Sequence, residues 1–401
     1  MGNMLREKLY SILGGYSDEI IEMRRYLHKY PELSFKEFNT AGYILDFYEK
    51  HKKNGVEVKY PVGKNGISVK IKGGAADKNK KTLALRGDFD ALGIQEQTDL
   101  PFGSVTPGVM HACGHDAHTA ILLAAAAALI EVSEELPGDA VIIHQYAEEV
   151  PPGGAADMIR DGVLEGADAV IGGHVWASYD FGEAAVSSGM IMAGRACFKA
   201  VIKGRGGHGS QPHLCADPIL AASHFVTAAQ SIVSRNIDPL ESAVVSFGRF
   251  EGLGTFNAIP EIVSLEGDVR SFSEKTGKFI ERRFKEILAG ICEAYSCSFE
   301  LSYTHDYPPV NNDEKLAELA KSFINSGGVP DLALRAGNPT TGSEDFSYYQ
   351  GKIPGLYVFF GAKPNGEAYP HHHPKFDIDE RCLIGCAKFY AGFTALFLEQ
   401  K

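Results

Sequence analysis

Thiol, imidazole and carboxylate side chains gather in one short segment, His111-Ala-Cys113-Gly-His115-Asp116-Ala-His118. Thiolate and imidazole are the usual ligands of zinc-like divalent metals. Cys113 and His115 can bind one metal cluster because the glycine between them lets the chain turn sharply. A buried free cysteine beside helix-capping polar residues is the alternative. For an isolated Cys-x-His pair both interpretations stand.

Two adjacent acids, Glu148 and Glu149, follow the apolar run Val141 to Ile143. Adjacent carboxylates can divide their tasks, one binding a metal ion and the other acting as a general base. The alternative is a solvated loop edge.

Two further histidine groups stand in comparable places. His174 follows Ile171-Gly172-Gly173, and His372 lies in the triple-histidine segment 371–373. Taken alone, the first could be a structural histidine and the second a surface loop. With the Cys113 thiolate, the His115 imidazole and one of the two adjacent carboxylates, they supply ligands for a pair of metal ions, which is a device for hydrolysis.

Other candidate motifs fail on their context. Gly204 to Gly209 matches the dinucleotide pattern Gly-x-Gly-x-x-Gly, but Pro212 follows at once and no helix is expected there. Cys382 and Cys386 are spaced for the core face of a helix. Cys292 and Cys297 have no histidine near them in sequence.

Short apolar runs that read as strands precede the polar groups. They are Val56 to Tyr60, Ile67 to Ile71, Thr82 to Leu85, Val141 to His144, Ala169 to Gly172 and Leu356 to Phe360. Helical stretches separate most of them, as in His118 to Ile130, so we expect an α/β fold with a mostly parallel sheet flanked by helices. Ser17 is the expected N-cap of an early helix that stops at Pro31. Polar residues at strand ends, including Arg86 to Asp90, are where the chemistry of such folds collects.

The pattern changes between Met190 and Asp306. The expected order is a strand at 197–202, a helix at 217–233, strands at 243–250 and 262–269, a helix at 274–295 and a strand at 298–303. This β-α-β-β-α-β order is that of a ferredoxin-like α+β unit. We therefore expect an inserted domain over 190–306, with the first domain formed by 1–189 and 307–401 and ending in a helix from about Asp379 to Leu398.

Composition narrows the class of protein. With 39 Lys and Arg against 51 Asp and Glu, the net charge is −12, which is not that of a nucleic-acid binder.

The longest candidate apolar run, Ala120 to Ile130, is about half a membrane span, so no membrane partner is expected. The first residues lack the apolar core of a secretory signal, and seven irregularly spaced cysteines do not suggest a disulfide framework. The expected location is the cytoplasm.

Many separated motifs together resemble the dinuclear metallo-amidohydrolases. They are 27–35, 86–92, 111–116, 147–149, 173–174, 204–208, 257–260, 343–346 and 372–374. The resemblance runs in order from about Ile20 to Glu380. The family includes hippurate hydrolase, N-acyl-amino-acid amidohydrolases, auxin-conjugate hydrolases and N-acetyl-diaminopimelate deacetylase, with metallopeptidase relatives and a zinc-exopeptidase-like fold.

The resemblance implies roles for individual residues. The implied metal ligands are Cys113, His115, Glu149, His174 and His372. Glu148 is implied as the catalytic acid and base, and Asp90 as a residue that orients a ligand. The inserted domain would be a lid that also forms a homodimer or a higher oligomer. His208 would reach the partner's site and stabilise the oxyanion, while Asn257 and Arg270 would hold the substrate carboxylate.

Two segments depart from the family pattern. The loop Val150 to Gly154 has more prolines than many members, and His371-His372-His373 stands where Leu-His-Ser or Leu-His-Asn is commoner. His372 is the chosen ligand because Pro374 follows two positions later, as in the family. For Arg270 the guanidinium suits a carboxylate, although an ion pair on the lid surface is the alternative.

The expected activity is hydrolysis of N-acyl amino acids, with N-acetyl, N-benzoyl or similar acyl groups. The products would be a carboxylic acid and a free amino acid. Two divalent metal ions per subunit are implied, zinc or manganese, with cobalt or nickel also compatible. A dipeptidase or carboxypeptidase on the same scaffold is the close alternative. A metal-binding protein without turnover is the distant one, and Glu148 argues against it because a mere binder would not need that residue.

Overall fold

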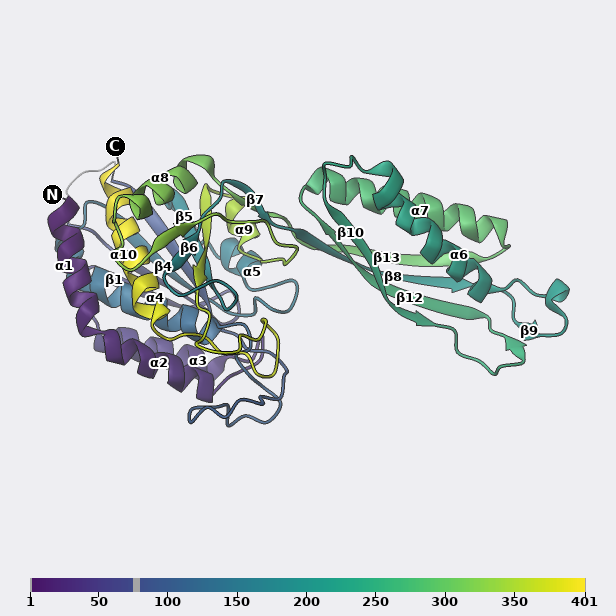
Figure 1. The fold of residues 1–401 in the computed structure, drawn as a ribbon, viewed down its shortest axis with the longest axis horizontal. Helices are drawn as coiled ribbons and strands as arrows, with labels where there is room; N and C mark the ends of the chain where they lie inside the picture. The colour runs from purple at the N-terminus through teal and green to yellow at the C-terminus, as the bar shows by residue number, and fades with distance from the viewer. Residues whose placement is uncertain (1, 75–79, 401) are drawn as a thin grey trace. The chain divides into compact units, whose positions relative to one another are not determined.

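The computed structural model describes residues 2–74 and 80–400, which fold into two compact units (Figure 1). The first unit contains the chain up to Gly189, Asn311–Asn338 and the chain from Asp345 onward. The second unit contains Met190–Val310 and Pro339–Glu344. The second unit is thus inserted into the first, and the return of Pro339–Glu344 to it was not foreseen from the sequence.

The first unit is built on an eight-stranded sheet with the order β1-β2-β4-β3-β5-β16-β6-β15. The strands are β1 (Val56–Val62), β2 (Gly66–Ile71), β3 (Thr82–Asp88), β4 (Asp139–Gln145), β5 (Ala169–Trp176), β6 (Glu183–Ala185), β15 (Ala333–Arg335) and β16 (Gly355–Gly361). Strands β4, β3, β5 and β16 run parallel, whereas β1, β2 and β4 pair antiparallel, as do β16 and β6. The expected parallel arrangement therefore applies to the centre of the sheet.

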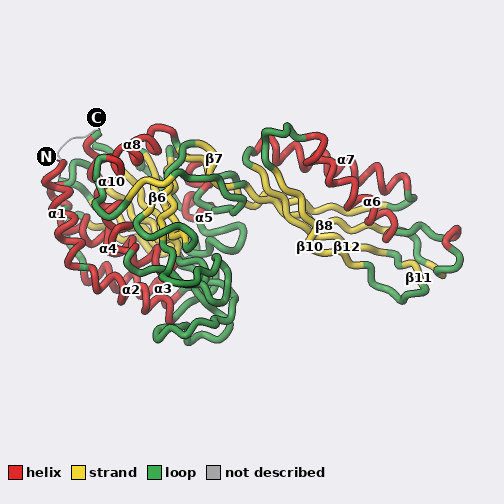
Figure 2. The backbone as a smooth tube through the Cα atoms, viewed as in Figure 1, coloured by secondary structure: helices red, strands yellow, loops and turns green. Residues whose placement is uncertain are grey.

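Helices cover both faces of this sheet, as the α/β prediction required (Figures 1 and 2). They are α1 (Gly2–Gly15), α2 (Ser17–Lys29), α3 (Phe38–Lys50), α4 (His115–Glu131), α5 (Ala155–Arg160), α8 (Glu314–Asn325), α9 (Ser347–Gln350) and α10 (Cys382–Glu399). Phe360 of β16 packs against Phe389 of α10, with ring centroids 5.4 Å apart. Tyr357, three positions earlier and so on the opposite face, packs against Phe346 beside α9, with ring centroids 4.9 Å apart.

Helix α10 is long enough and apolar enough to cross a membrane, judged by its length and composition. Within the described residues, however, 78% of its apolar window is buried, and the helix lies against α1 and α4. Cys382 and Cys386 are both buried, as their spacing predicted. We therefore assign α10 as a core helix. With 18 residues it is longer than the run Ala120 to Ile130, so the expectation that this run is the longest apolar candidate is wrong.

The second unit has the ferredoxin-like order expected from the sequence. Its elements are β8 (Gly194–Lys203), α6 (Pro218–Ser231), β10 (Ala243–Glu251), β12 (Ile262–Ser271), α7 (Glu274–Ala294) and β13 (Ser298–Tyr307). The four strands pair antiparallel in the order β10-β12-β8-β13, and Figure 2 shows α6 and α7 on one face. Phe198, Phe225 and Phe284 meet in the core between this face and the helices.

Smaller elements complete the chain. They are the short strands β7 (Gly189–Met192), β9 (Gly207–His208), β11 (Ala258–Ile259) and β14 (Val310–Asn312), and the short helical turns at 133–135, 212–214 and 232–236. Strands β9 and β11 pair antiparallel, so that His208 is opposite Ala258.

Candidate metal centre

The side chains expected to bind metal come together at the carboxyl edge of the central strands. Parallel strands end at the same edge of a sheet, which is why segments far apart in the sequence meet there. The ligand atoms of Cys113, His115 and His174 all lie within 4.8 Å of one another. The same holds for the ligand atoms of Cys113, Glu149 and His372. Cys113 belongs to both groups.

His115 is the first residue of α4 and is held with one nitrogen facing the cluster. Gly114, which precedes it, has φ 90°, and a Cβ atom there would lie 2.5 Å from a methyl group of Val175. His115 Nδ1 lies 3.0 Å from the Asp90 carbonyl oxygen and 3.1 Å from Asp90 Oδ1, so this nitrogen carries the proton and donates. Among the described residues, none forms a hydrogen bond with the buried His115 Nε2. A ring nitrogen without a hydrogen bond, with carboxylate oxygens of Asp88 and Glu149 3.8 and 3.9 Å away, is suited to a metal ion.

Asp90 connects two of the candidate ligands. Besides its contact with His115, its Oδ2 accepts hydrogen bonds from Ser34 Oγ at 2.7 Å and from the Glu149 backbone N–H at 3.0 Å. The carboxylate is buried. These contacts support the orienting role expected of Asp90.

Glu148 lies beside the cluster, and its backbone is held by a residue that the sequence did not reveal. Its carboxylate and the ligand atoms of His115 and Glu149 lie within 4.8 Å of one another. Ala147 has φ 50°, a conformation that is uncommon for a residue with a Cβ. The Ala147 N–H donates to Glu37 Oε1 at 2.8 Å. Burial, and next the charge of Asp90, raise the pKa of Glu37 to about 7.

The triple-histidine segment places only one of its side chains among the donors. His372 Nε2 lies 3.2 Å from Glu149 Oε1, in agreement with the choice of this histidine. His371 Nε2 instead lies 3.0 Å from the Val175 carbonyl oxygen. His373 stacks on Tyr369, with ring centroids 4.6 Å apart.

Electrostatics in the cluster favour a bound cation. Burial lowers the pKa of His115, but the charges of Asp88 and Asp90 outweigh that effect and raise this pKa to about 10. Burial, followed by the negative charges of Glu149 and Glu148, holds the pKa of the Cys113 thiol well above its usual range. A divalent cation would relieve both effects because it replaces the proton on each donor. Thiolate, imidazole and carboxylate are also the donor set that such ions take.

The three other predicted residues belong to the second unit. His208 is exposed at β9, and its Nδ1 accepts a hydrogen bond from the Ser210 N–H at 3.1 Å. Asn257 lies close to it, because the Asn257 carbonyl oxygen accepts from the Gly209 N–H at 2.8 Å. Arg270 does not join them. It pairs with Asp268 at 2.6 Å, near the end of β12.

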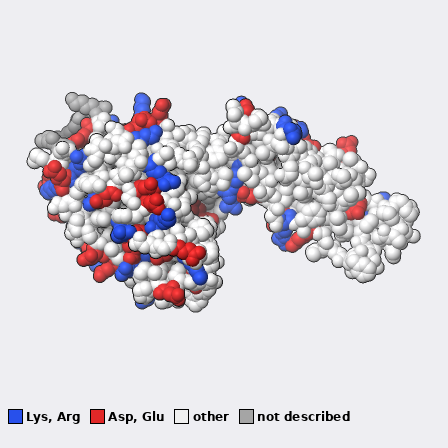
Figure 3. All heavy atoms as spheres, in the orientation of Figure 1, with Lys and Arg blue, Asp and Glu red and all other residues white. Residues whose placement is uncertain are grey.

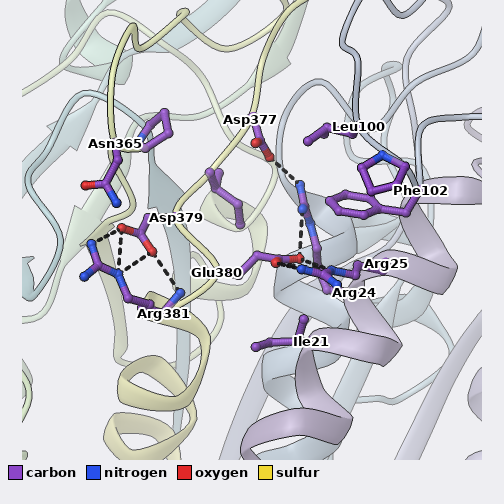
Figure 4. Close-up of a pocket in the computed structure, with 13 residues that line it drawn as sticks. Ile21, Arg24, Arg25, Leu100, Phe102, Asn365, Asp377, Asp379, Glu380 and Arg381 are labelled. Atoms are coloured by element: carbon purple, nitrogen blue, oxygen red, sulfur yellow. Dashed lines mark hydrogen bonds and ion pairs between the residues drawn. The ribbon is translucent and has the colours of Figure 1, made fainter.

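A separate pocket of about 560 Å³ opens in the first unit between α2 and the start of α10 (Figure 4). Arg24 lines it, is fully buried and forms ion pairs with Asp377 at 3.0 Å and with Glu380 at 3.2 Å. Its Nε also donates to Asp116 Oδ2 at 2.8 Å. Asp116 follows His115 in α4, so Arg24 connects this pocket to the helix that carries a candidate ligand.

Comparisons with known proteins show the family to which the chain belongs. The model of peptidase family M20/M25/M40 matches residues 84–395. N-acetyl-L-cysteine deacetylase of Bacillus subtilis is 39% identical, covering 92% of this chain and 86% of the relative. Thermostable carboxypeptidase 1 of Saccharolobus solfataricus is also 39% identical, covering 94% of this chain and 95% of the relative. The crystal structure of the YXEP protein of Bacillus subtilis, titled a dinuclear metal-binding peptidase of the M20 family, has a TM-score of 0.83 at 33% identity and covers 97% of this chain and 100% of its own. The resemblance inferred from the motifs is confirmed, and this chain belongs to peptidase family M20/M25/M40 as a metal-dependent amidohydrolase.

Proposed function

We propose that the protein hydrolyses the amide bond of N-acyl amino acids and releases a carboxylic acid and a free amino acid. The observation that carries this proposal is the pair of overlapping donor groups beside a further buried carboxylate, Glu148. The relative named N-acetyl-L-cysteine deacetylase supports the choice of substrate class.

Five residues would hold two divalent metal ions. They are Cys113, His115, Glu149, His174 and His372. Cys113 is a member of both donor groups. Two ions bound there would polarise the scissile carbonyl and lower the pKa of water toward ~7. Zinc or manganese suits the mixed thiolate, imidazole and carboxylate set, and cobalt or nickel is also compatible.

Glu148 would move the proton. As general base it takes a proton from the attacking water, and as general acid it then gives that proton to the leaving nitrogen. Glu37 accepts a hydrogen bond from the Ala147 N–H, one residue before Glu148, and so would help to position Glu148. His208 would donate a hydrogen bond to the carbonyl oxygen as negative charge develops on it.

The substrate-binding residues of the second unit favour a homodimer. Strand β12 starts at Ile262, near the β9–β11 hairpin, and Arg270 lies eight residues further along it. At ~3.3 Å per residue, Ile262 and Arg270 are about 26 Å apart. A small N-acyl amino acid cannot span this distance. His208 and Arg270 would therefore act on one substrate only if they come from different subunits.

The loops beside His208 have the character of an interface. Segments 206–216 and 252–260 contain no Lys, Arg, Asp or Glu, and Figure 3 shows the corresponding end of the second unit mostly white on the visible face. Phe256 and Leu253 are exposed there, at 104% and 82%. Apolar groups exposed together mark surfaces that a partner covers. We propose that this partner is a second subunit, and that the dimer or a higher oligomer works in the cytoplasm without nucleic acid or membrane.

A carboxypeptidase or dipeptidase activity is the second candidate, supported by the relative named thermostable carboxypeptidase 1. Both reactions break an amide bond, so the metal centre alone does not separate them. Binding of metal without turnover is the remaining alternative. Glu148 weighs against it, because this buried carboxylate is not one of the five proposed ligands and a protein that only binds metal would not need it.

The test combines metal analysis with a panel of substrates. Protein loaded with zinc or manganese is offered N-acetyl, N-benzoyl and longer N-acyl amino acids, together with dipeptides that carry a free amine. Release of free amino acid from the N-acyl compounds is expected. Preference for the dipeptides would assign a peptidase, and metal binding without release from any compound would contradict the proposal.

A further inference from the structure

The backbone of one residue, Val175, accepts hydrogen bonds from two imidazoles through its carbonyl oxygen and donates one to a third through its N–H. Its carbonyl oxygen accepts from His174 Nδ1 at 2.7 Å and lies 3.0 Å from His371 Nε2. The Val175 N–H donates to His118 Nε2 at 3.0 Å. His174 is the residue just before Val175 and is one of the proposed metal ligands.

These contacts determine where each ring carries its proton. His118 Nε2 accepts from Val175, so the proton of His118 is on Nδ1, which donates to Asp88 Oδ1 at 2.6 Å. His371 must carry its proton on Nε2 in order to donate to the Val175 oxygen. His174 likewise carries its proton on Nδ1. The His174 Nε2 lone pair is thereby left facing Cys113 Sγ, 3.3 Å away.

His371 also packs against the ring that it helps to orient. The centroids of the His371 and His174 rings are 5.0 Å apart at an interplanar angle of 74°. The centroid of the His371 ring also lies 4.6 Å from that of Trp176 and 4.9 Å from that of Phe376. Residue 371 is therefore attached to the end of β5 by one hydrogen bond and by ring packing.

The attachment bears on a second ligand as well. His372 follows His371 directly and has φ 65°, and its side chain lies beside Glu149 instead of Val175. The His372 N–H donates to the Ala112 carbonyl oxygen at 2.8 Å, beside Cys113. A loop held at His371 thus presents His372 to Glu149, 3.2 Å away.

We propose that His371 is a positioning residue of the metal centre, which fixes the tautomer and orientation of His174 and the place of His372 through the Val175 carbonyl group. The inference rests on the proposed metal site. Partners that orient a metal-binding histidine are typically worth about 10- to 100-fold in metal affinity. His371 would not itself touch substrate or metal.

The test compares three variants with the full-length protein. His371→Leu removes the donor and keeps an apolar side chain, while His371→Gln keeps an N–H close to the position of Nε2. His373→Leu is the matched control, because it makes the same substitution two residues away. Among the described residues, His373 contacts Lys375 and Tyr369 and has no contact with Val175. The measurements are the affinity for Co(II) in competition with a chelator, the visible absorption of bound Co(II), and thermal unfolding of the metal-free protein.

We expect His371→Leu to lose about 10- to 100-fold in Co(II) affinity and to shift the absorption bands. His371→Gln should recover most of both, and His373→Leu should match the wild type. Metal-free unfolding should change little among the variants, which separates positioning from general stability. Wild-type affinity and an unshifted spectrum in His371→Leu would overturn the inference.

Failure of the proposed function has a different signature. A wild-type protein that binds two Co(II) ions, loses affinity in His371→Leu and hydrolyses no N-acyl amino acid would contradict the function and leave the positioning role in place. A wild-type protein that binds no Co(II) would overturn both.

Discussion

Glu148 and Glu149 are neighbours in the chain with different surroundings. Glu149 is tied through its N–H to Asp90, and its carboxylate lies 3.2 Å from His372 Nε2. Glu148 follows a backbone position that Glu37 holds, and its carboxylate is buried. The contacts of Glu149 suit a ligand, and those of Glu148 suit a positioned base.

Replacing each acid by its amide should separate the two roles. Glu148→Gln keeps the size of the side chain and removes the base, so kcat should fall by about 10²- to 10⁴-fold with metal content unchanged. Glu149→Gln should lower metal content because a charged ligand is lost. Turnover and metal content are measured on the same preparations. Equal behaviour of the two variants, or the reverse assignment, would contradict the division.

At the scale of elements, a buried ion pair joins α2 to the start of α4. Arg24 and Asp116 side chains are about 1% and 0% exposed, and 2.8 Å separates Arg24 Nε from Asp116 Oδ2. Burial opposes the charged form of Asp116, but Arg24 and His28 outweigh this and hold its pKa well below the usual range. Removing one partner would leave a charge buried without compensation.

Arg24→Met should therefore lower the free energy of unfolding by about 3 to 5 kcal/mol. Arg25→Met is the matched control, because Arg25 is half exposed and its ion pair with Glu380 should be worth less than about 1 kcal/mol. Urea unfolding of the metal-free protein measures both. An equal effect of the two variants would show that burial does not set the cost.

His28 should make the same junction sensitive to pH. Burial lowers its pKa, but hydrogen bonds to Asp116 and Glu96 outweigh burial and raise the pKa above 6.5. The charged form thus contributes stability that is fully present below about pH 6.5 and is lost as the pH rises through the higher folded-state pKa. The stability advantage of the wild type over His28→Asn should be larger at about pH 5.5 than at about pH 9. A difference independent of pH would contradict the prediction.

At the scale of the whole molecule, the proposed dimer predicts complementation between inactive variants. If His208 acts in the partner's site, mixing His208→Ala with Glu148→Gln gives mixed dimers in which one site has both functional residues. Activity should then return after subunit exchange, to at most about a quarter of the wild-type level for random pairing, since half the dimers are mixed and each has one intact site. Exchange without recovery would assign His208 to its own subunit's site.

Local patterns in the sequence already indicated most of this fold. The apolar runs of the central strands, the ferredoxin-like order and the buried face of α10 all follow from hydrophobic periodicity, which acts over a few residues. The metal motif was visible for the same reason, because Cys113 and His115 are close in the chain. The start of a helix that depends on a neighbouring helix could not be predicted from such local patterns. Ser17 is not an N-cap, since α1 runs to Gly15 just before α2 and the Ser17 hydroxyl donates to the Gly14 carbonyl oxygen.

Contacts between distant segments were decided only by the tertiary structure. The sequence named the histidine run but could not show that His372 faces Glu149 while His371 bonds to Val175, 196 positions away. Ser34 and Glu37 were likewise not distinguished as supports of the site. Such partners are set by where strands and loops end in space. Local sequence patterns specified most elements and the types of donor, whereas packing determined which nitrogen of each histidine faces the metal centre.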